Sequence, residues 1–144
     1  MVKDAKGFTL IELMVVIVIL GILAAIIAPR IIGRTDEAKV TEAKVQIKNL
    51  ETALKLYKID NGSYPTTEQG LEALVRKPTT GSIPRHWRRG GYLEKKSLPN
   101  DPWGNPYQYA SPGLNDDLDI FSYGGDGARG GEGIDEDIES WNLD

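Results

Sequence analysis

The feature that most constrains this chain is an apolar segment near its start, from Phe8 to Ala28. Within it only Thr9 and Glu12 carry polar side chains, and residues 13–28 run without a polar break. At about 1.5 Å of rise per residue, a helix of this length spans about 30 Å, which matches the hydrocarbon core of a bilayer. The segment therefore predicts a membrane-spanning helix rather than the buried core helix of a small domain.

A secretory signal peptide is the other interpretation of this segment. Lysines precede it, and Ala24 and Ala25 resemble a cleavage site. However, the apolar run is longer than the ~7–15 residues of a signal peptide, and it leads into an amphipathic helix. We therefore expect it to be retained. Basic residues lie on both sides of the span, so charge counting leaves its orientation open.

Beyond the span, the sequence predicts that the helix continues into a domain. Pro29 predicts a kink rather than an end, because helical periodicity resumes at once. The turn chemistry of residues 60–65 then ends the helix at about Ile59. Between these points, one apolar stripe recurs at steps of three and four residues: Val40, Ala43, Ile47, Leu50, Leu54 and Tyr57. This stripe predicts packing of the second half of the helix on a small domain core.

The rest of the chain predicts an α+β fold. Residues 67–76 read as a short helix capped by Thr66 or Thr67, and residues 79–106 read as a loop rich in glycine and proline. Residues 107–110 and 118–123 alternate as antiparallel strands do, and residues 111–117 join them. The expected architecture is a long N-terminal helix packed on a small antiparallel sheet, with an irregular C-terminal loop.

Composition excludes several classes of function. The formal net charge is −4 and the pI is about 5.1, so we expect no nucleic-acid partner. The chain has no cysteine and one histidine, His86, which excludes His/Cys metal sites and Cys–His catalysis. No Gly-x-Ser-x-Gly elbow accompanies His86, so we expect no catalytic residue and no enzyme. The basic run of residues 85–89 is interpreted as an Arg–Trp stack on a surface loop.

A glycine-rich acidic segment, residues 124–142, is the remaining candidate site. Its glycines permit a tight loop that presents carbonyl groups. Among them stand three carboxylates: Asp126, Asp135 and Asp137. Oxygen ligands without nitrogen or sulfur favour a hard cation, and a flexible set favours Ca²⁺ over Mg²⁺. EF-hand and calcium β-roll patterns each fit only in part. A flexible acidic tail is the alternative, although the apolar residues spaced along 134–141 favour docking.

The N-terminal residues also resemble a known family. The sequence KGFTLIELMVVIVILGILAAIIAPR, residues 6–30, is similar to the class III signal of type IV pilins and type II secretion pseudopilins. The resemblance implies that prepilin peptidase cuts between Gly7 and Phe8 on the cytoplasmic face and then N-methylates Phe8. It divides the chain into a leader (1–7), a transmembrane and filament-core helix (8–29) and a periplasmic globular domain (30–144).

Cleavage would supply a partner for Glu12. A carboxylate inside a bilayer costs about 2.5–3.5 kcal/mol on insertion scales, so a charged partner is expected. The new amine of Phe8, four residues earlier, is one candidate. The Phe8 amine of a neighbouring subunit is the other, and this pair would set the register of helices in a filament. The alternative is that the Glu12 carboxylate reaches the lipid headgroups.

The C-terminal half of the sequence resembles one branch of this family more than the others. The sequence LPNDPWGNPYQY, followed by DIFSYGGDG, GGEG and DEDIESWN, is similar to the major pseudopilin family of type II secretion. In that family a Ca²⁺ ion holds this loop, whereas adhesive pilins commonly close it with a disulfide. The resemblance implies that the ligands are the Tyr123 backbone carbonyl and the carboxylates of Asp126, Asp135 and Asp137.

The resemblance implies a structural subunit of the type II secretion pseudopilus. The subunit would cross the bacterial inner membrane once, with its N-terminus cytoplasmic, and would lie in lipid before assembly. It would then polymerise into a helical filament together with minor pseudopilins, on an inner-membrane platform with its ATPase. The filament would help drive folded proteins across the outer membrane. The alternatives are a type IV pilin or minor pilin for adhesion, motility or DNA uptake, or a membrane-anchored calcium-binding module that does not polymerise.

Overall fold

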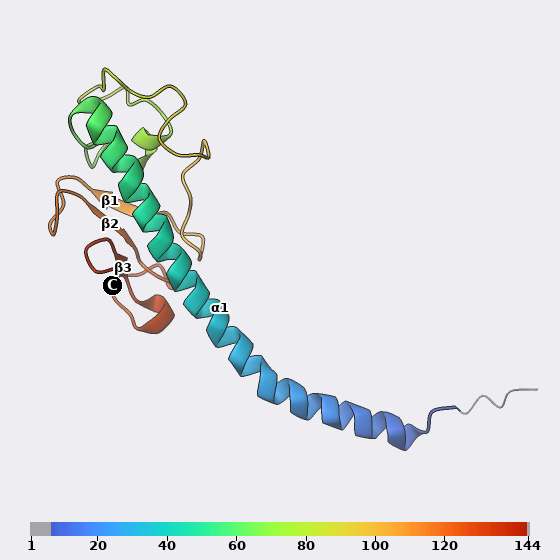
Figure 1. Ribbon diagram of the computed structural model, residues 1–144. Coiled ribbons are helices and arrows are strands. Elements are labelled where there is room, and N and C mark those ends of the chain that lie inside the picture. Colours follow the sequence, from blue (N-terminus) through green and yellow to red (C-terminus); the bar gives the residue numbers. More distant parts are fainter. Residues whose placement is uncertain (1–6, 144) are drawn as a thin grey trace, which may run out of the picture. The chain divides into compact units, whose positions relative to one another are not determined.

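The computed structural model describes residues 7–143, without the side chains of residues 28–34. Its longest element is the helix α1, Leu10–Asn61, drawn from blue to green in Figure 1. The helix continues through Pro29, so the prediction that this proline does not end it is confirmed.

The helix ends in the turn that the sequence predicts. Gly62 follows the last helical residue with a left-handed φ of 85°, and its N–H donates to the Lys58 carbonyl at 2.7 Å. A glycine in this conformation is a common helix terminator, because it lacks the Cβ atom that would clash there.

The chain divides into two compact units, and the division falls inside α1 between Asp36 and Glu37. The first unit contains the apolar part of the helix. The second contains the remainder of α1 and all the strands of the described chain. The boundary that the sequence predicts between residues 29 and 30, for the end of the membrane helix, stays a prediction.

The core of the second unit is built on the predicted helical stripe. Val40 is half-buried, and the other five members are buried: Ala43, Ile47, Leu50, Leu54 and Tyr57. They pack in one cluster with Leu74, Ile120 and Ile138, which come from three later segments of the chain. The period of the stripe was therefore sufficient to identify the buried face of α1.

Three short strands form one antiparallel sheet in the order β1-β2-β3. They are β1 (Gln108–Ala110), β2 (Asp119–Ser122) and β3 (Ile138–Glu139). Figure 1 shows them beside α1, within the second unit. The predicted pair of strands is confirmed, with Tyr109 opposite Ile120. The expectation of an irregular tail is wrong at β3, where Ile138 pairs with Ser122 and is 6% exposed.

The helix predicted over residues 67–76 is wrong in length and type. The structure has a turn followed by the one-turn 3₁₀ helix η1, Leu71–Leu74. Gly70, with φ of 61°, interrupts the helical conformation. The helix cap predicted at Thr66 or Thr67 is wrong too, because η1 begins after Gly70 without a side-chain cap. Thr66 instead stabilises the preceding turn: its Oγ1 accepts the Gln69 N–H at 3.2 Å, and Gln69 Oε1 accepts the Thr66 N–H at 3.1 Å.

The predicted Arg–Trp stack in residues 85–89 is also corrected. Trp87 turns inward, where its Nε1–H donates to the Ala73 carbonyl at 2.8 Å. The Arg88 guanidinium instead lies over the Tyr92 ring, 5.3 Å from its centroid, and pairs with Asp60 at 3.2 Å. The tryptophan therefore contributes to the core, because its N–H finds a carbonyl there.

We expect the stripe to control the stability of the second unit. Leu54→Ala, in a fragment of residues 37–144, should lower the free energy of unfolding by about 2–5 kcal/mol, because Leu54 is 0% exposed. Lys55→Ala, at an exposed position of the same turn, should change it by less than about 0.5 kcal/mol. Denaturant unfolding measures both, and equal losses would contradict this account of the core.

Stability should also fall at alkaline pH. Burial raises the pKa of Tyr109 from its usual 10.0 to about 12, and burial also raises the pKa values of Tyr57 and Tyr107. Above the usual pKa the unfolded chain loses these protons before the folded chain does, so the free energy of unfolding decreases from about pH 10 to 12.

Tyr109→Phe tests this pH dependence. The variant loses the hydrogen bond from Tyr109 Oη to the Pro65 carbonyl, so it should be less stable than the parent chain near neutral pH. Its stability should nevertheless fall less steeply above pH 10 than that of the parent chain. Denaturant unfolding at several pH values compares the slopes, and parallel curves would show that Tyr109 does not contribute.

Candidate functional site

The apolar part of α1 is covered by no other part of the described chain. An eighteen-residue window, Leu10–Ile27, has a mean hydropathy of 3.1 and is 0% buried. Large side chains such as Leu10 and Ile11 are 77% and 70% exposed. So much exposed apolar surface requires lipid or other protein helices around it. The length and composition of this window are those of a membrane span.

The predicted processing site lies just before this helix. Gly7 and Phe8 precede the start of α1, and the Phe8 side chain is 85% exposed. A Cβ atom built at Gly7 would meet nothing within 4 Å. Among the described residues, packing therefore gives no reason for glycine at this position, and Gly7 and Phe8 are both exposed.

Glu12 forms a reciprocal cap at the start of α1. Its Oε2 accepts hydrogen bonds from the Thr9 N–H at 2.9 Å and from Thr9 Oγ1 at 2.8 Å. Thr9 Oγ1 in turn accepts the Glu12 N–H at 3.3 Å. This is a capping box, in which each side chain satisfies an N–H that the helix leaves unpaired. Sequence reasoning missed it, although the spacing Thr-x-x-Glu indicates such a cap.

The glycine-rich segment starts from a hydrogen-bonded corner at the end of β2. Ser122 Oγ donates to Asp101 Oδ2 at 2.6 Å and accepts the Gly124 N–H at 3.2 Å. The other oxygen of Asp101 accepts the N–H groups of Trp103 and Asn105. Asp101 and Ser122 are both buried, so these bonds fix where the loop begins. Sequence analysis did not identify either residue.

Within this segment, two parts of the chain approach so closely that only glycine fits. A Cβ atom on Gly124 would lie 2.8 Å from the carbonyl carbon of Asp135, and one on Gly131 would overlap the carbonyl oxygen of Asp135. Both glycines also have positive φ, of 68° and 101°. The glycines therefore allow the returning chain around Asp135 to lie against residues 124–131.

Three of the four predicted calcium ligands, Asp126, Asp135 and Asp137, lie in this segment, but their carboxylates are not gathered at one point. Asp126 Oδ1 accepts the Ala128 N–H at 2.9 Å, and Asp137 Oδ2 accepts the Gly130 N–H at 3.0 Å. Asp135 is half-buried, as is Tyr123, whose carbonyl is the fourth predicted ligand. Among residues 7–143, no three His, Asp or Glu side chains form a group that could hold a metal ion.

One oxygen in this segment is chemically unusual. Asp137 Oδ1 is buried and has no hydrogen-bond partner in the described structure. A buried carboxylate oxygen without a partner is costly, and it is the kind of atom that a cation would stabilise. His86 lies outside this segment, with its backbone N–H bonded to Asn61 Oδ1 at 3.2 Å. The segment therefore offers oxygen ligands rather than a nucleophile and base.

Comparison with known families gives one match to the N-terminal segment and one to the remainder of the chain. The family described as "Type II secretion system (T2SS), protein G" matches residues 30–141, and the "Prokaryotic N-terminal methylation motif" matches residues 2–28. Together they cover the candidate processing site, its apolar helix and all but the last three residues of the second compact unit.

Individual relatives are similar over almost their whole length. The type II secretion system core protein G of Pseudomonas aeruginosa is 55% identical over 140 residues, which is 97% of each chain. That of Vibrio cholerae is also 55% identical, covering 98% of this chain and 94% of its own. The crystal structure of the major pseudopilin of enterohaemorrhagic Escherichia coli is 45% identical, covers 76% of this chain and 92% of its own, and has a TM-score of 0.66. The chain therefore belongs to the protein G family of type II secretion systems, the structural subunits of the pseudopilus.

Proposed function

We propose that this chain polymerises through its apolar helix into a helical pseudopilus whose growth helps drive folded proteins across the outer membrane. The observation that supports this proposal is the eighteen-residue apolar surface of α1, which no other part of the described chain buries. In a monomer, lipid would cover this surface. In the filament, the same surfaces of neighbouring copies would cover one another.

Processing is proposed to begin with a prepilin peptidase, which removes residues 1–7 and methylates the amine of Phe8. The match of the N-terminal methylation motif to residues 2–28 supports this step. The exposure of Gly7 and Phe8 supports it further, because no described residue packs where a side chain at position 7 would lie. A glycine without a packing reason is consistent with selection by an enzyme that binds this segment.

Glu12 is proposed to set the register between subunits by pairing with the Phe8 amine of a neighbouring copy. Both hydrogen bonds from Thr9 are accepted by one oxygen, Oε2, so the capping box uses only one of the two carboxylate oxygens of Glu12. A carboxylate in lipid gains most from a positive partner, and cleavage creates such a charge four residues earlier.

The location and partners follow from this proposal. The chain would cross the inner membrane once, with its N-terminus in the cytoplasm and its second unit in the periplasm. It would assemble with minor pseudopilins on an inner-membrane platform driven by an ATPase. It would bind no nucleic acid and would catalyse no reaction. The family match favours this role over a type IV pilin. Polymerisation distinguishes it from a membrane-anchored module.

We also propose that Ca²⁺ binds the glycine-rich segment, with Tyr123, Asp126, Asp135 and Asp137 as ligands. Its support is the unpartnered, buried Oδ1 of Asp137 together with the close approach of the two parts of the segment. Asp126 would have to turn from the Ala128 N–H to join an ion. A bound Ca²⁺ would supply positive charge that holds these carboxylates together.

Glu12→Gln tests the charge separately from the cap. Glutamine keeps an oxygen that can accept the Thr9 N–H but removes the negative charge, so we expect filaments and secretion to fall to near background. Thr9→Val is the control, because it removes the hydroxyl of the capping box and keeps the charge. It should retain most of the filament yield. Secretion and sheared filaments are measured in cells, and a fully active Glu12→Gln chain would refute the charge pair.

Thermal unfolding of residues 37–144 in Ca²⁺, in Mg²⁺ and in chelator tests the ion. An ion at 100 times its dissociation constant adds roughly 2.7 kcal/mol, or several degrees in Tm. We expect a rise with Ca²⁺ that is lost in Asp137→Asn and kept in Glu132→Gln, a matched change at an exposed carboxylate of the same segment. Equal curves with Ca²⁺ and with chelator would contradict the site.

A further inference from the structure

Leu114 is held out from the second unit at the tip of the loop between β1 and β2. Its side chain is 98% exposed. A single exposed leucine is ordinary on protein surfaces. This one differs because the backbone that carries it is fixed from inside the protein.

The fixing group is the carboxylate of Asp119, a residue that is only 3% exposed. Its Oδ2 accepts the Leu114 N–H at 2.7 Å and the Asn115 N–H at 3.1 Å, and its Oδ1 accepts the Asp116 N–H at 3.2 Å. Gly113 completes the turn, because a Cβ atom there would lie 2.6 Å from the Asp119 carboxyl carbon. The loop therefore presents Leu114 on a defined backbone rather than on a mobile tip.

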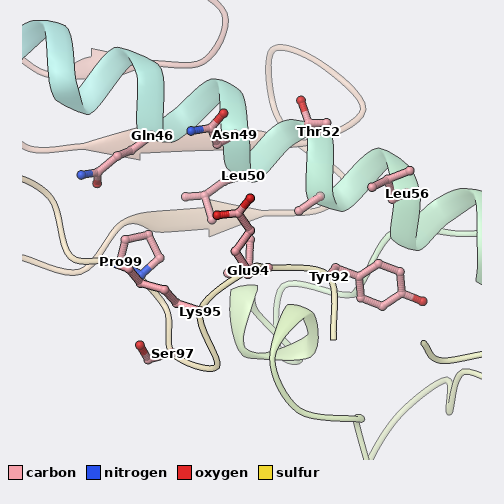
Figure 2. Close-up of a pocket in the computed structure, with 12 residues that line it drawn as sticks. Gln46, Asn49, Leu50, Thr52, Leu56, Tyr92, Glu94, Lys95, Ser97 and Pro99 are labelled. Atoms are coloured by element: carbon pink, nitrogen blue, oxygen red, sulfur yellow. The ribbon is translucent and has the colours of Figure 1, made fainter. Parts of the chain in front are cut away.

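A groove with apolar walls lies elsewhere on the same unit, between α1 and the segment of residues 92–99. Figure 2 shows the helix on one side of it and that segment on the other. Its volume is about 580 Å³, enough for several side chains. Its apolar lining is Leu50, Ala53, Leu56, Tyr92, Leu93 and Pro99.

The leucine and the groove are on different sides of the unit. In Figure 1 the loop joining β1 to β2 projects to the left of α1, whereas the golden segment that carries residues 92–99 lies to its right. A subunit therefore cannot insert its own Leu114 into its own groove. A second copy can, and the pair then still has one free leucine and one free groove to offer to further copies.

The charges around the two surfaces are complementary. The exposed Asp116 follows Leu114 closely in the loop, and Asp117 beside it is paired with Lys58 at 3.3 Å. At the groove, Lys95 and its exposed neighbour Lys96 outnumber one carboxylate, Glu94. An acidic loop with an apolar tip thus matches an apolar groove with a net basic edge.

We propose that Leu114 of one copy inserts into the groove between α1 and residues 92–99 of the next copy. The two contact surfaces are different, so the contact is heterologous, which is the kind of contact that a helical filament requires. This inference rests on the proposed polymerisation. It adds to the apolar helices a second contact, made between the second units of neighbouring copies.

Disulfide crosslinking of the full chain in secreting cells tests this contact, because the chain has no cysteine of its own. Asn115→Cys is placed beside the leucine, and Ser97→Cys is placed at the exposed edge of the groove. A chain carrying both should give a ladder of dimers, trimers and longer products on oxidation. Two chains carrying one cysteine each should give dimers only, and only when expressed together.

Leu114→Ser in the double-cysteine chain should reduce the ladder by about tenfold or more, because the apolar group that fills the groove is lost. Ile83→Ser is the matched control, since Ile83 is 55% exposed and does not line the groove. It should leave the ladder unchanged.

Sheared filaments are collected from the same cells, so that the contact and the polymer are scored separately. Filaments without a ladder, dimers only from the double-cysteine chain, or a ladder that survives Leu114→Ser would each overturn the contact while polymerisation stands. The absence of filaments from the chain without introduced cysteines would refute polymerisation and the contact together.

Discussion

The burial of one face of α1 is the interaction on which the second unit depends. The unit has three strands of two to four residues and no disulfide, so neither the sheet nor a covalent link can hold it together alone. Its segments instead pack on the ridge formed by Ile47, Leu54 and Tyr57. Two buried carboxylates, Asp101 and Asp119, then organise the loops by accepting backbone N–H groups. The helix supplies the hydrophobic energy, and the carboxylates supply the loop geometry.

The parts of the fold that follow from local sequence could be predicted. The buried stripe from Val40 to Tyr57 repeats the helical period, and residues 107–123 contain two alternating runs with a turn between them. The predictions that failed concern elements that depend on single residues or on contacts between residues far apart in sequence. Gly70 converts an expected helix into a turn and η1 through one positive φ. The strand β3 has two residues, too few for any pattern, and exists because β2 lies beside it.

The candidate site divides in the same way. The N-terminal methylation motif, which contains Gly7, Phe8 and Glu12, could be recognised because it is continuous in sequence, and the family match covers it. The roles of the three residues stay predictions. The corner that positions the glycine-rich segment could not be identified. Its hydrogen bond joins Ser122 to Asp101, twenty-one residues apart, and the sequence around each residue reads as ordinary loop and strand. Periodicity does not encode contacts between such distant polar groups.

The short strand β3 also determines what the sheet exposes. It covers the outer edge of β2, and just beyond it the Ser140 N–H donates to the Ile120 carbonyl at 2.8 Å while Ser140 Oγ accepts the Ile120 N–H at 3.1 Å. Release of the C-terminal segment would uncover a row of unpaired backbone groups, which is a template for strand addition by another chain. The C-terminal segment therefore covers backbone groups of β2 that would otherwise be open to pairing with another chain. A pairing of only two residues thus closes a sheet edge that would otherwise favour association through backbone hydrogen bonds.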